Sequence, residues 1–201
     1  ETLKNVDLVL AEDTRKSKIL FKKHAITTSL KSYHINNEHR VVNLYVSSLV
    51  DGKKIALVSD AGTPSISDPG FLLIRESIKK NIEIICLPGA TALIPALVMS
   101  GLPSEKFVFE GFLPKKKGRD SRLKELAIEK RTVILYESPL RVIKTLQDLK
   151  EFFGSDRRIS LSREISKIYE ETYRGTVEDA IAHLSNKNPK GEFVICIDKL
   201  G

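Results

Sequence analysis

The feature that most constrains this sequence is the regular alternation of short apolar, strand-like runs with helix-like segments along its first half. Such alternation is typical of a parallel sheet whose strands are joined by helices. The expected strands are residues 6–11, 29–33, 54–59, 82–87 and 107–110. The expected helices begin near Thr14, Asn37, Asp68 and Thr91. The first half is therefore predicted to form a parallel α/β domain.

The pattern changes around Gly111, where a short apolar turn is followed by a run of lysines. We expect a domain boundary there, with an N-terminal domain of residues 1–110 and a C-terminal domain of residues 111–201. In the second domain the expected strands are residues 132–136, 159–162, 170–174 and 192–197, and the expected helices are residues 121–129, 139–153 and 177–185. Residues 169–174 alternate in polarity like a half-exposed, antiparallel strand. The prediction is thus two α/β domains, the first with a parallel sheet and the second with a mixed sheet.

Composition bounds the class of protein. With 201 residues, 41% hydrophobic and 29% charged, the chain is long enough for one large or two small domains with apolar cores. The formal net charge is +7, and more of the basic excess lies after residue 110. This charge fits a polyanionic partner such as RNA, although an excess of lysine is also a common aid to solubility.

Other features concern the environment of the protein. Cys86 and Cys196 each lie in an apolar, strand-like run, which predicts buried free thiols in a reducing compartment, and the default location is the cytoplasm. No stretch approaches the ~20 apolar residues that span a bilayer, so no membrane association is expected. The four histidines have no metal-ligand spacing, and no metal is assigned. The chain begins with Glu1, and we expect an upstream strand and loop that this sequence does not contain.

Two polar loops follow expected strands of the first domain. Residues 60–70 carry two carboxylates, Asp60 and Asp68, with Gly62 between them, and residues 88–91 form a second, smaller loop. In parallel sheets ligands bind outside the carboxyl ends of the strands, so both loops are candidate ligand sites. A purely structural reading is also open, in which Asp68 caps a helix and Asp60 accepts hydrogen bonds from the backbone. Neither loop has the spacing of a dinucleotide or triphosphate site, which favours a smaller, nucleoside-like ligand.

These loops also carry a resemblance. Residues 57–70, 87–92 and 11–15 together resemble the tetrapyrrole methylase superfamily, and most closely its RNA-methylating branch. Further similar segments are residues 109–114, 136–139, 162–164 and 174–176. The resemblance covers essentially the whole chain. It implies a homodimer of two-domain subunits that transfers a methyl group from S-adenosylmethionine, held in a cleft between the domains, to the 2′-hydroxyl of a cytidine in 16S rRNA.

The resemblance also implies which residues bind the cofactor. Carried over by position, they come from the two loops and from the end of a strand in the second domain: Asp60, Ala61, Gly62, Pro88, Gly89, Ala90, Thr91, Tyr136, Glu137 and Ser138. This family begins with a further strand and glycine-bearing loop, which this sequence lacks. The visible site is therefore expected to be incomplete.

A ribose hydroxyl is a poor nucleophile and benefits from a hydrogen-bond acceptor or general base. Candidates are Asp13, Glu137 and Glu164. Each has a structural alternative, which we favour for any single one: Asp13 as a helix cap, Glu137 paired with Arg141, and Glu164 paired with Lys167.

The candidates for contact with RNA phosphates are basic residues near the expected cleft and in the lysine run: Arg15, Lys115, Lys116, Lys117, Arg119, Arg163 and Lys167. Such contacts position RNA without reading its sequence. The alternative for the lysine run is a solvated linker.

Two other functions remain open at this point. One is a methylase of the same superfamily that acts on a tetrapyrrole or on a protein side chain. The other is a noncatalytic module for RNA binding or dimerisation.

Overall fold

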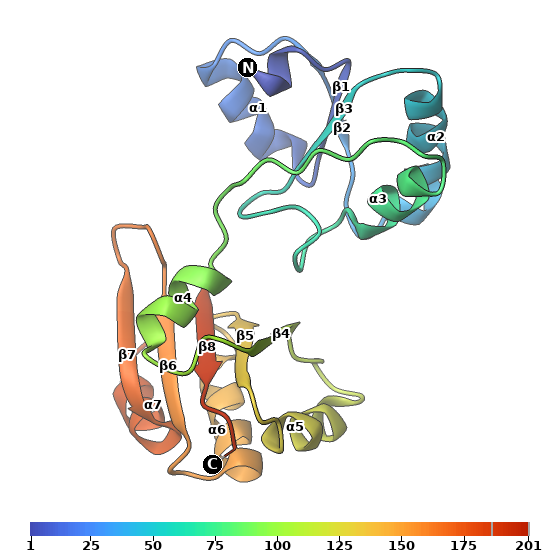
Figure 1. Cartoon of the computed structure of the whole chain (residues 1–201). Coiled ribbons are helices and arrows are strands. Elements are labelled where there is room, and N and C mark those ends of the chain that lie inside the picture. Colours follow the sequence, from blue (N-terminus) through green and yellow to red (C-terminus); the bar gives the residue numbers. More distant parts are fainter. Residues whose placement is uncertain (186, 201) are drawn as a thin grey trace. The chain divides into compact units, whose positions relative to one another are not determined.

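The computed structural model describes residues 1–185 and 187–200 (Figure 1). The chain forms two compact units, Glu1–Ala90 and Thr91–Gly201. Each unit has its own sheet and its own core, as the alternation along the sequence predicts.

The first unit is built on a three-stranded parallel sheet in the order β2-β1-β3. Its elements are η1 (Thr2–Lys4), β1 (Leu8–Ala11), α1 (Thr14–Lys23), β2 (Ser29–Ser32), α2 (Glu38–Val50), β3 (Ile55–Val58) and α3 (Phe71–Ile78). Figure 1 shows α1 on one side of this sheet and α2 and α3 on the other. The core between the sheet and the helices α2 and α3 contains the buried Leu10, Tyr33, Tyr45 and Leu73.

One expected strand does not form. Residues 82–87 have no regular secondary structure, and Ile85 is 74% exposed. An apolar run becomes a strand only if a neighbour satisfies its backbone groups, and no described strand pairs with these residues. Cys86 is consequently exposed, contrary to the expectation of two buried thiols, whereas Cys196 is buried in β8 (Phe193–Ile197).

The second unit is built on a five-stranded mixed sheet in the order β4-β5-β8-β6-β7. Its other elements are α4 (Leu93–Ser100), β4 (Phe107–Phe112), α5 (Arg119–Ala127), β5 (Thr132–Glu137), α6 (Val142–Phe153), β6 (Arg158–Arg163), β7 (Glu171–Thr176) and α7 (Val177–Ser185). Strands β4 and β5 are parallel, and the other pairs are antiparallel. The mixed sheet and the antiparallel, half-exposed β7 are both as predicted.

Alternation along the central strands produces a core on each face of this sheet, because successive side chains of a strand point to opposite faces. On β5, Val133 and Leu135 belong to the larger core, which they share with α5, α6 and α7. Ile134 on the same strand belongs to the smaller core with Leu97 of α4. The sheet of the second unit is therefore covered by helices on both faces.

The compact units divide earlier than the expected boundary at residue 110. The division falls after Ala90, because α4 packs on the second sheet and β4 pairs with β5 in that same sheet. Gly111 lies within β4, and the lysines that follow form a loop inside the second unit.

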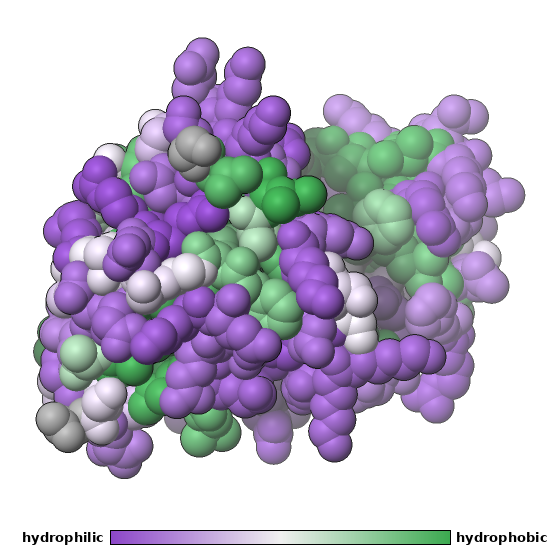
Figure 2. All heavy atoms as spheres, turned by 90° about the horizontal axis from the view of Figure 1, so that it is seen from below, coloured by the Kyte–Doolittle hydropathy of each residue, from purple (hydrophilic) through white to green (hydrophobic). Residues whose placement is uncertain are grey.

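The face of the molecule shown in Figure 2 is mostly hydrophilic, with hydrophobic side chains gathered in separate patches. Within the described residues, no helix has both the length and the apolar character that crossing a bilayer requires.

Candidate functional site

The first part of the candidate site lies where two neighbouring strands end. Because β1 and β3 are parallel and adjacent, their carboxyl ends bring Asp13 and Asp60 together. The backbone N–H of Asp13 donates to Asp60 Oδ1 at 3.2 Å, and Lys16 Nζ donates to Asp60 Oδ2 at 2.7 Å. The backbone N–H of Asp60 in turn donates to Glu12 Oε2 at 3.4 Å. Contacts from Glu12, from the Asp13 backbone and from Lys16 of α1 thus fix the position of Asp60.

The loop of residues 60–70 has an unusual backbone. Ser65 and Ser67 have positive φ angles of 72° and 63°, a backbone conformation that residues other than glycine rarely adopt. The Ser59 hydroxyl holds the start of the loop by donating to the carbonyl of Gly62 at 3.0 Å. Strained residues of this kind are concentrated at ligand sites, where the surrounding structure maintains them.

The two predicted cofactor loops meet within the first unit. Thr63 Oγ1 donates to the carbonyl of Ala90 at 3.2 Å, and Gly62 lies close to the same carbonyl. Ala61, Gly62 and the residues 88–90 are exposed and have small side chains or none, apart from the proline ring of Pro88. Accessible backbone beside a carboxylate suits the amino-acid and ribose groups of a nucleoside-like ligand. These residues therefore fit the predicted ligand class, and Thr91 follows directly in the chain.

The predicted cofactor residues of the second unit lie at the end of β5. The Tyr136 ring packs edge-on against Phe109, with ring centroids 4.9 Å apart. Glu137 is buried, and its Oε1 accepts from the backbone N–H of Ser138 and from Arg141, both at 2.7 Å. Glu137 Oε2 accepts from Thr145 Oγ1 at 2.7 Å. The Glu137 carboxylate thus shapes the turn that follows β5, whereas Tyr136 and Ser138 are only partly buried.

The three candidate bases all make the structural contacts considered as alternatives. Asp13 caps α1 and accepts from the Arg15 side chain at 2.7 Å and from the Arg15 backbone at 2.9 Å. These bonds hold the pKa of Asp13 far below its usual range. Glu164 accepts from the backbone N–H of Glu192 and from Lys167, both at 2.9 Å, which lowers its pKa. Glu137 pairs with Arg141 as above, so each of the three carboxylates already has a cationic partner.

The candidate RNA contacts differ in their exposure. The Arg15 side chain is 89% exposed although it is paired with Asp13, and Lys115, Lys116 and Lys117 are exposed. Arg163 pairs with Glu171 at 3.3 Å. Lys167 bridges Glu164 and Glu192 at 2.9 Å each.

Arg119 requires a correction. It is only 6% exposed, and its guanidinium is bonded to Asp148, Thr145 and the carbonyl of Pro114. A guanidinium that is buried and bonded through each of its three nitrogens is not exposed to a phosphate, so Arg119 is not an RNA contact in this structure.

Sequence reasoning missed several residues of this region. Lys16 reaches Asp60 because it lies one helical turn after the cap of α1, a relation visible only once β1 and β3 are paired. Thr63, which joins the two loops, lies within residues 57–70, but its hydrogen bond to Ala90 could not be foreseen from its position in the sequence.

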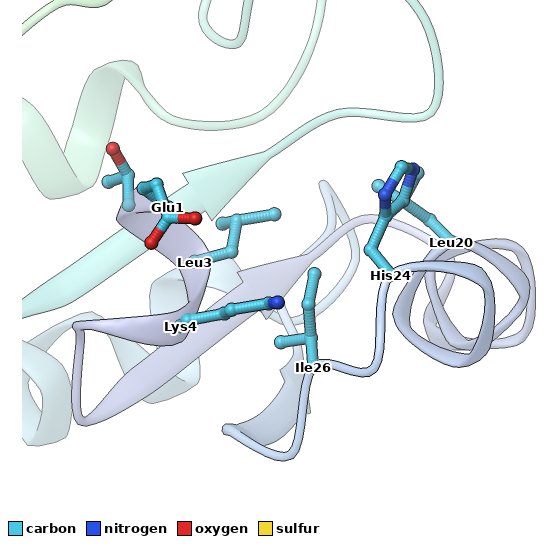
Figure 3. A pocket seen from close by; sticks show the side chains of 7 residues that line it. Glu1, Leu3, Lys4, Leu20, His24 and Ile26 are labelled. Carbon is cyan, nitrogen blue, oxygen red and sulfur yellow. The ribbon is translucent and has the colours of Figure 1, made fainter.

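One cavity of the first unit is separate from these loops. It has a volume of about 330 Å³ and lies beside the residues that lead into β1 and β2, lined by Glu1, Thr2, Leu3, Lys4, Leu20, His24 and Ile26 (Figure 3). No predicted site residue lines it. In residues 1–185 and 187–200, no group of three or more histidine, cysteine, aspartate or glutamate side chains is placed to hold a metal ion.

The two-unit fold and the loops at the strand ends define a class of enzyme. Residues 1–181 match the family model described as Tetrapyrrole (Corrin/Porphyrin) Methylases. The chain belongs to the tetrapyrrole methylase family, whose enzymes use S-adenosylmethionine as the methyl donor.

Curated relatives narrow this class. A Synechocystis sp. protein named Ribosomal RNA small subunit methyltransferase I is 50% identical over 198 residues, which are 98% of this chain and 71% of that protein. A Thermotoga maritima protein of the same name is 43% identical over 98% of this chain and 88% of its own length.

Solved structures agree on the fold. A diphthine synthase superposes with a TM-score of 0.73 at 11% identity, covering 98% of this chain and 81% of that one. A cobalt precorrin-4 methyltransferase gives a TM-score of 0.68 at 16% identity, covering 98% of this chain and 85% of that one. At such identities the likeness concerns the fold alone.

Proposed function

We propose that this protein is an S-adenosylmethionine-dependent methyltransferase that modifies the 2′-hydroxyl of a cytidine ribose in 16S rRNA. The observation that carries the proposal is the 43–50% identity, over 98% of the chain, to proteins named Ribosomal RNA small subunit methyltransferase I. The cobalt precorrin-4 methyltransferase of similar structure is far more distant in sequence, at 16% identity. A tetrapyrrole substrate therefore has less support than RNA.

For the cofactor we propose the loops of residues 60–62 and 88–91, together with Tyr136 near the end of β5 and Ser138 directly after it. Their support is the Thr63–Ala90 hydrogen bond, which places the two loops side by side, and the exposed small residues in both. The Asp60 carboxylate is the acceptor for a hydroxyl or ammonium group, in exchange for its present contact with Lys16. Glu137 contributes by holding the Ser138 turn.

When bound, S-adenosylmethionine supplies an electrophilic methyl group on a sulfonium. The protein must hold the ribose oxygen in line with that carbon, at a reactive separation of about 3–3.5 Å. Because Asp13 and Glu164 bind protons weakly, we propose that positioning provides most of the rate enhancement. Of the three carboxylates we propose Asp13 as the acceptor of a hydrogen bond from the hydroxyl, since it lies beside Asp60.

For RNA we propose contacts from Arg15, Arg163, Lys167 and the lysines 115–117 to phosphates. Exposure supports Arg15 and the lysines most strongly.

As implied by the family resemblance, we also propose a homodimer, acting in the cytoplasm, where small ribosomal subunits are found. Light scattering at several protein concentrations measures the oligomeric state.

The direct test incubates the protein and radiolabelled S-adenosylmethionine with small ribosomal subunits that lack the modification. The expected result is label in 16S rRNA, on a cytidine ribose after nuclease digestion. Label confined to a macrocycle or to protein would overturn the assignment.

Replacing Asp60 tests the cofactor site. Asp60→Asn should weaken S-adenosylmethionine binding roughly tenfold, because a charged acceptor is lost. Titration calorimetry measures the affinity. Asp51→Asn is the matched control, since Asp51 is an exposed aspartate at the C-cap of α2, before β3 rather than after it. Equal affinities of both variants for S-adenosylmethionine would show that Asp60 does not contribute to binding.

A further inference from the structure

Arg119 of the second unit is a buried cation, and each nitrogen of its guanidinium has a hydrogen-bond acceptor. Its Nε donates to Asp148 Oδ2 at 2.8 Å, one terminal nitrogen donates to Thr145 Oγ1 at 2.8 Å, and the other donates to the carbonyl of Pro114 at 3.0 Å. Burying a guanidinium is costly unless its donors are satisfied, and here each nitrogen has an acceptor. The role of Arg119 is therefore different from that of an exposed arginine whose charge faces solvent.

The third of these bonds closes a loop. We call residues 113–118, between β4 and α5, the basic loop; it carries the exposed Lys115, Lys116 and Lys117. Arg119 follows the loop directly, and its side chain returns to the carbonyl at the loop's start. Its backbone N–H also donates to the carbonyl of Lys116 at 3.1 Å. One residue therefore holds the basic loop at its beginning, middle and end.

Further contacts tie this loop to the turn after β5. Thr145 Oγ1, which accepts from Arg119, donates to Glu137 Oε2 at 2.7 Å. Arg141, which pairs with Glu137 Oε1, also reaches the carbonyl of Leu113 at 3.4 Å. The basic loop and the Ser138 turn thus share one buried network of hydrogen bonds centred on Glu137.

We propose that Arg119 is a positioning residue that preorganises the basic loop so that its three lysines meet consecutive RNA phosphates. This inference rests on the proposed function, because it assumes an RNA substrate. Preorganisation matters because lysine side chains on an ordered loop lose less freedom on binding than the same side chains on a mobile one. Arg119 contributes to RNA affinity in this way without touching RNA.

The test uses the charge-conserving Arg119→Lys. An ammonium cannot match the three-way geometry of the guanidinium, so the loop is released while the net charge is unchanged. The measurement is the affinity for a 16S rRNA fragment across a salt series, because the slope of log K against log salt counts the phosphates that are contacted. Removing all three lysines with Lys115→Ala, Lys116→Ala and Lys117→Ala should reduce this slope by about 2 for a single strand.

If Arg119 positions the loop, Arg119→Lys alone should reduce the slope by about 1 or more and weaken RNA binding roughly tenfold at low salt. In the Arg119→Lys background, the three alanines should then have less effect than in the wild type. Arg131→Lys is the matched control, since Arg131 also pairs with a carboxylate but is exposed and lies outside the loop. It should leave the slope unchanged.

The inference would be overturned if Arg119→Lys left the salt slope unchanged, or if its effect on the slope and that of the three alanines were fully additive. It would also be overturned if the three alanine replacements did not alter the slope of the wild-type protein. Should Arg119→Lys fold poorly, Asp148→Asn removes one charged acceptor of Arg119 and should change the slope in the same direction. Methyl transfer to small subunits is measured in parallel for the wild type. Failure of that reaction would refute the proposed function, whereas transfer with unaltered slopes would refute only the role of Arg119.

Discussion

Gly70 illustrates how a single residue determines the shape of the candidate cofactor loop. Its φ of 143° is unfavourable for any side chain, and a Cβ added here would lie 2.4 Å from Ser65 Oγ and 2.7 Å from a methyl of Leu57. Ser65 itself has a positive φ. The strained conformation of the loop therefore requires glycine at position 70.

Gly70→Ala should lower the free energy of unfolding by about 2 kcal/mol and weaken S-adenosylmethionine binding, because the loop must shift. Denaturant titration and calorimetry measure the two effects. Gly52→Ala is the control: Gly52 also has a positive φ, 87°, but nothing lies within 4 Å of its Cβ position. It should cost about 1 kcal/mol and leave the cofactor affinity intact. Identical behaviour of the two variants would contradict the role of Gly70.

The two cysteines differ sharply in environment. Burial raises the pKa of the Cys196 thiol to about 12, whereas Cys86 is exposed. Because the thiolate is the reactive form, a disulfide reagent at pH 8 should modify one thiol per native chain and two after unfolding. Absorbance of the released thiolate counts the modified groups. Cys86→Ser should leave the native protein unreactive, and rapid modification of that variant would show that β8 is accessible.

At the scale of elements, helix α7 begins with a capping box formed by Thr176 and Asp179. The Asp179 N–H donates to Thr176 Oγ1 at 3.1 Å, and Asp179 Oδ2 accepts from the Thr176 hydroxyl at 2.7 Å and from its N–H at 3.2 Å. The same bonds from Thr176 lower the pKa of Asp179. Both residues therefore stabilise the start of the helix.

Thr176→Ala should reduce the free energy of unfolding by about 1 kcal/mol, and Thr176→Ser should retain most of it. The pH dependence follows from the sign of the shift. A carboxyl with a lowered folded-state pKa stabilises the protein above its unfolded pKa, and this contribution is lost as the pH falls through the folded value. Asp179→Asn should therefore be less stable than the wild type at pH 7, and the difference should shrink towards pH 3. A difference that is constant with pH would exclude this origin.

At the scale of the whole molecule, binding of the methyl-donor product offers a test that does not need RNA. S-adenosylhomocysteine at 100 times its dissociation constant should stabilise the protein by about 2.7 kcal/mol and raise the melting temperature by several degrees. Differential scanning fluorimetry measures the shift, and adenosine triphosphate at the same concentration serves as a control. No shift with S-adenosylhomocysteine would argue against a cofactor site in this chain.

The sequence by itself determined the class of fold, the positions of the two loops that we propose for the cofactor, and most elements. Hydrophobic periodicity and turn residues are local signals, and they placed β5, β6 and α7 within a few residues of their observed bounds. Strand pairing is not local. Residues 82–87 have the apolar pattern of a strand but no described partner, and β4 joined the second sheet although it was assigned to the first domain.

The tertiary structure alone decided how the charged residues are used. A sequence does not distinguish an exposed arginine from a buried one, and Arg119 was therefore predicted to bind RNA. In the structure, packing of α5 against α6 places Arg119 among Asp148, Thr145 and the Pro114 carbonyl. Likewise Lys16 became a partner of Asp60 only because β1 and β3 are neighbours. Burial and partners depend on contacts between distant segments, and those exist only once the chain has folded.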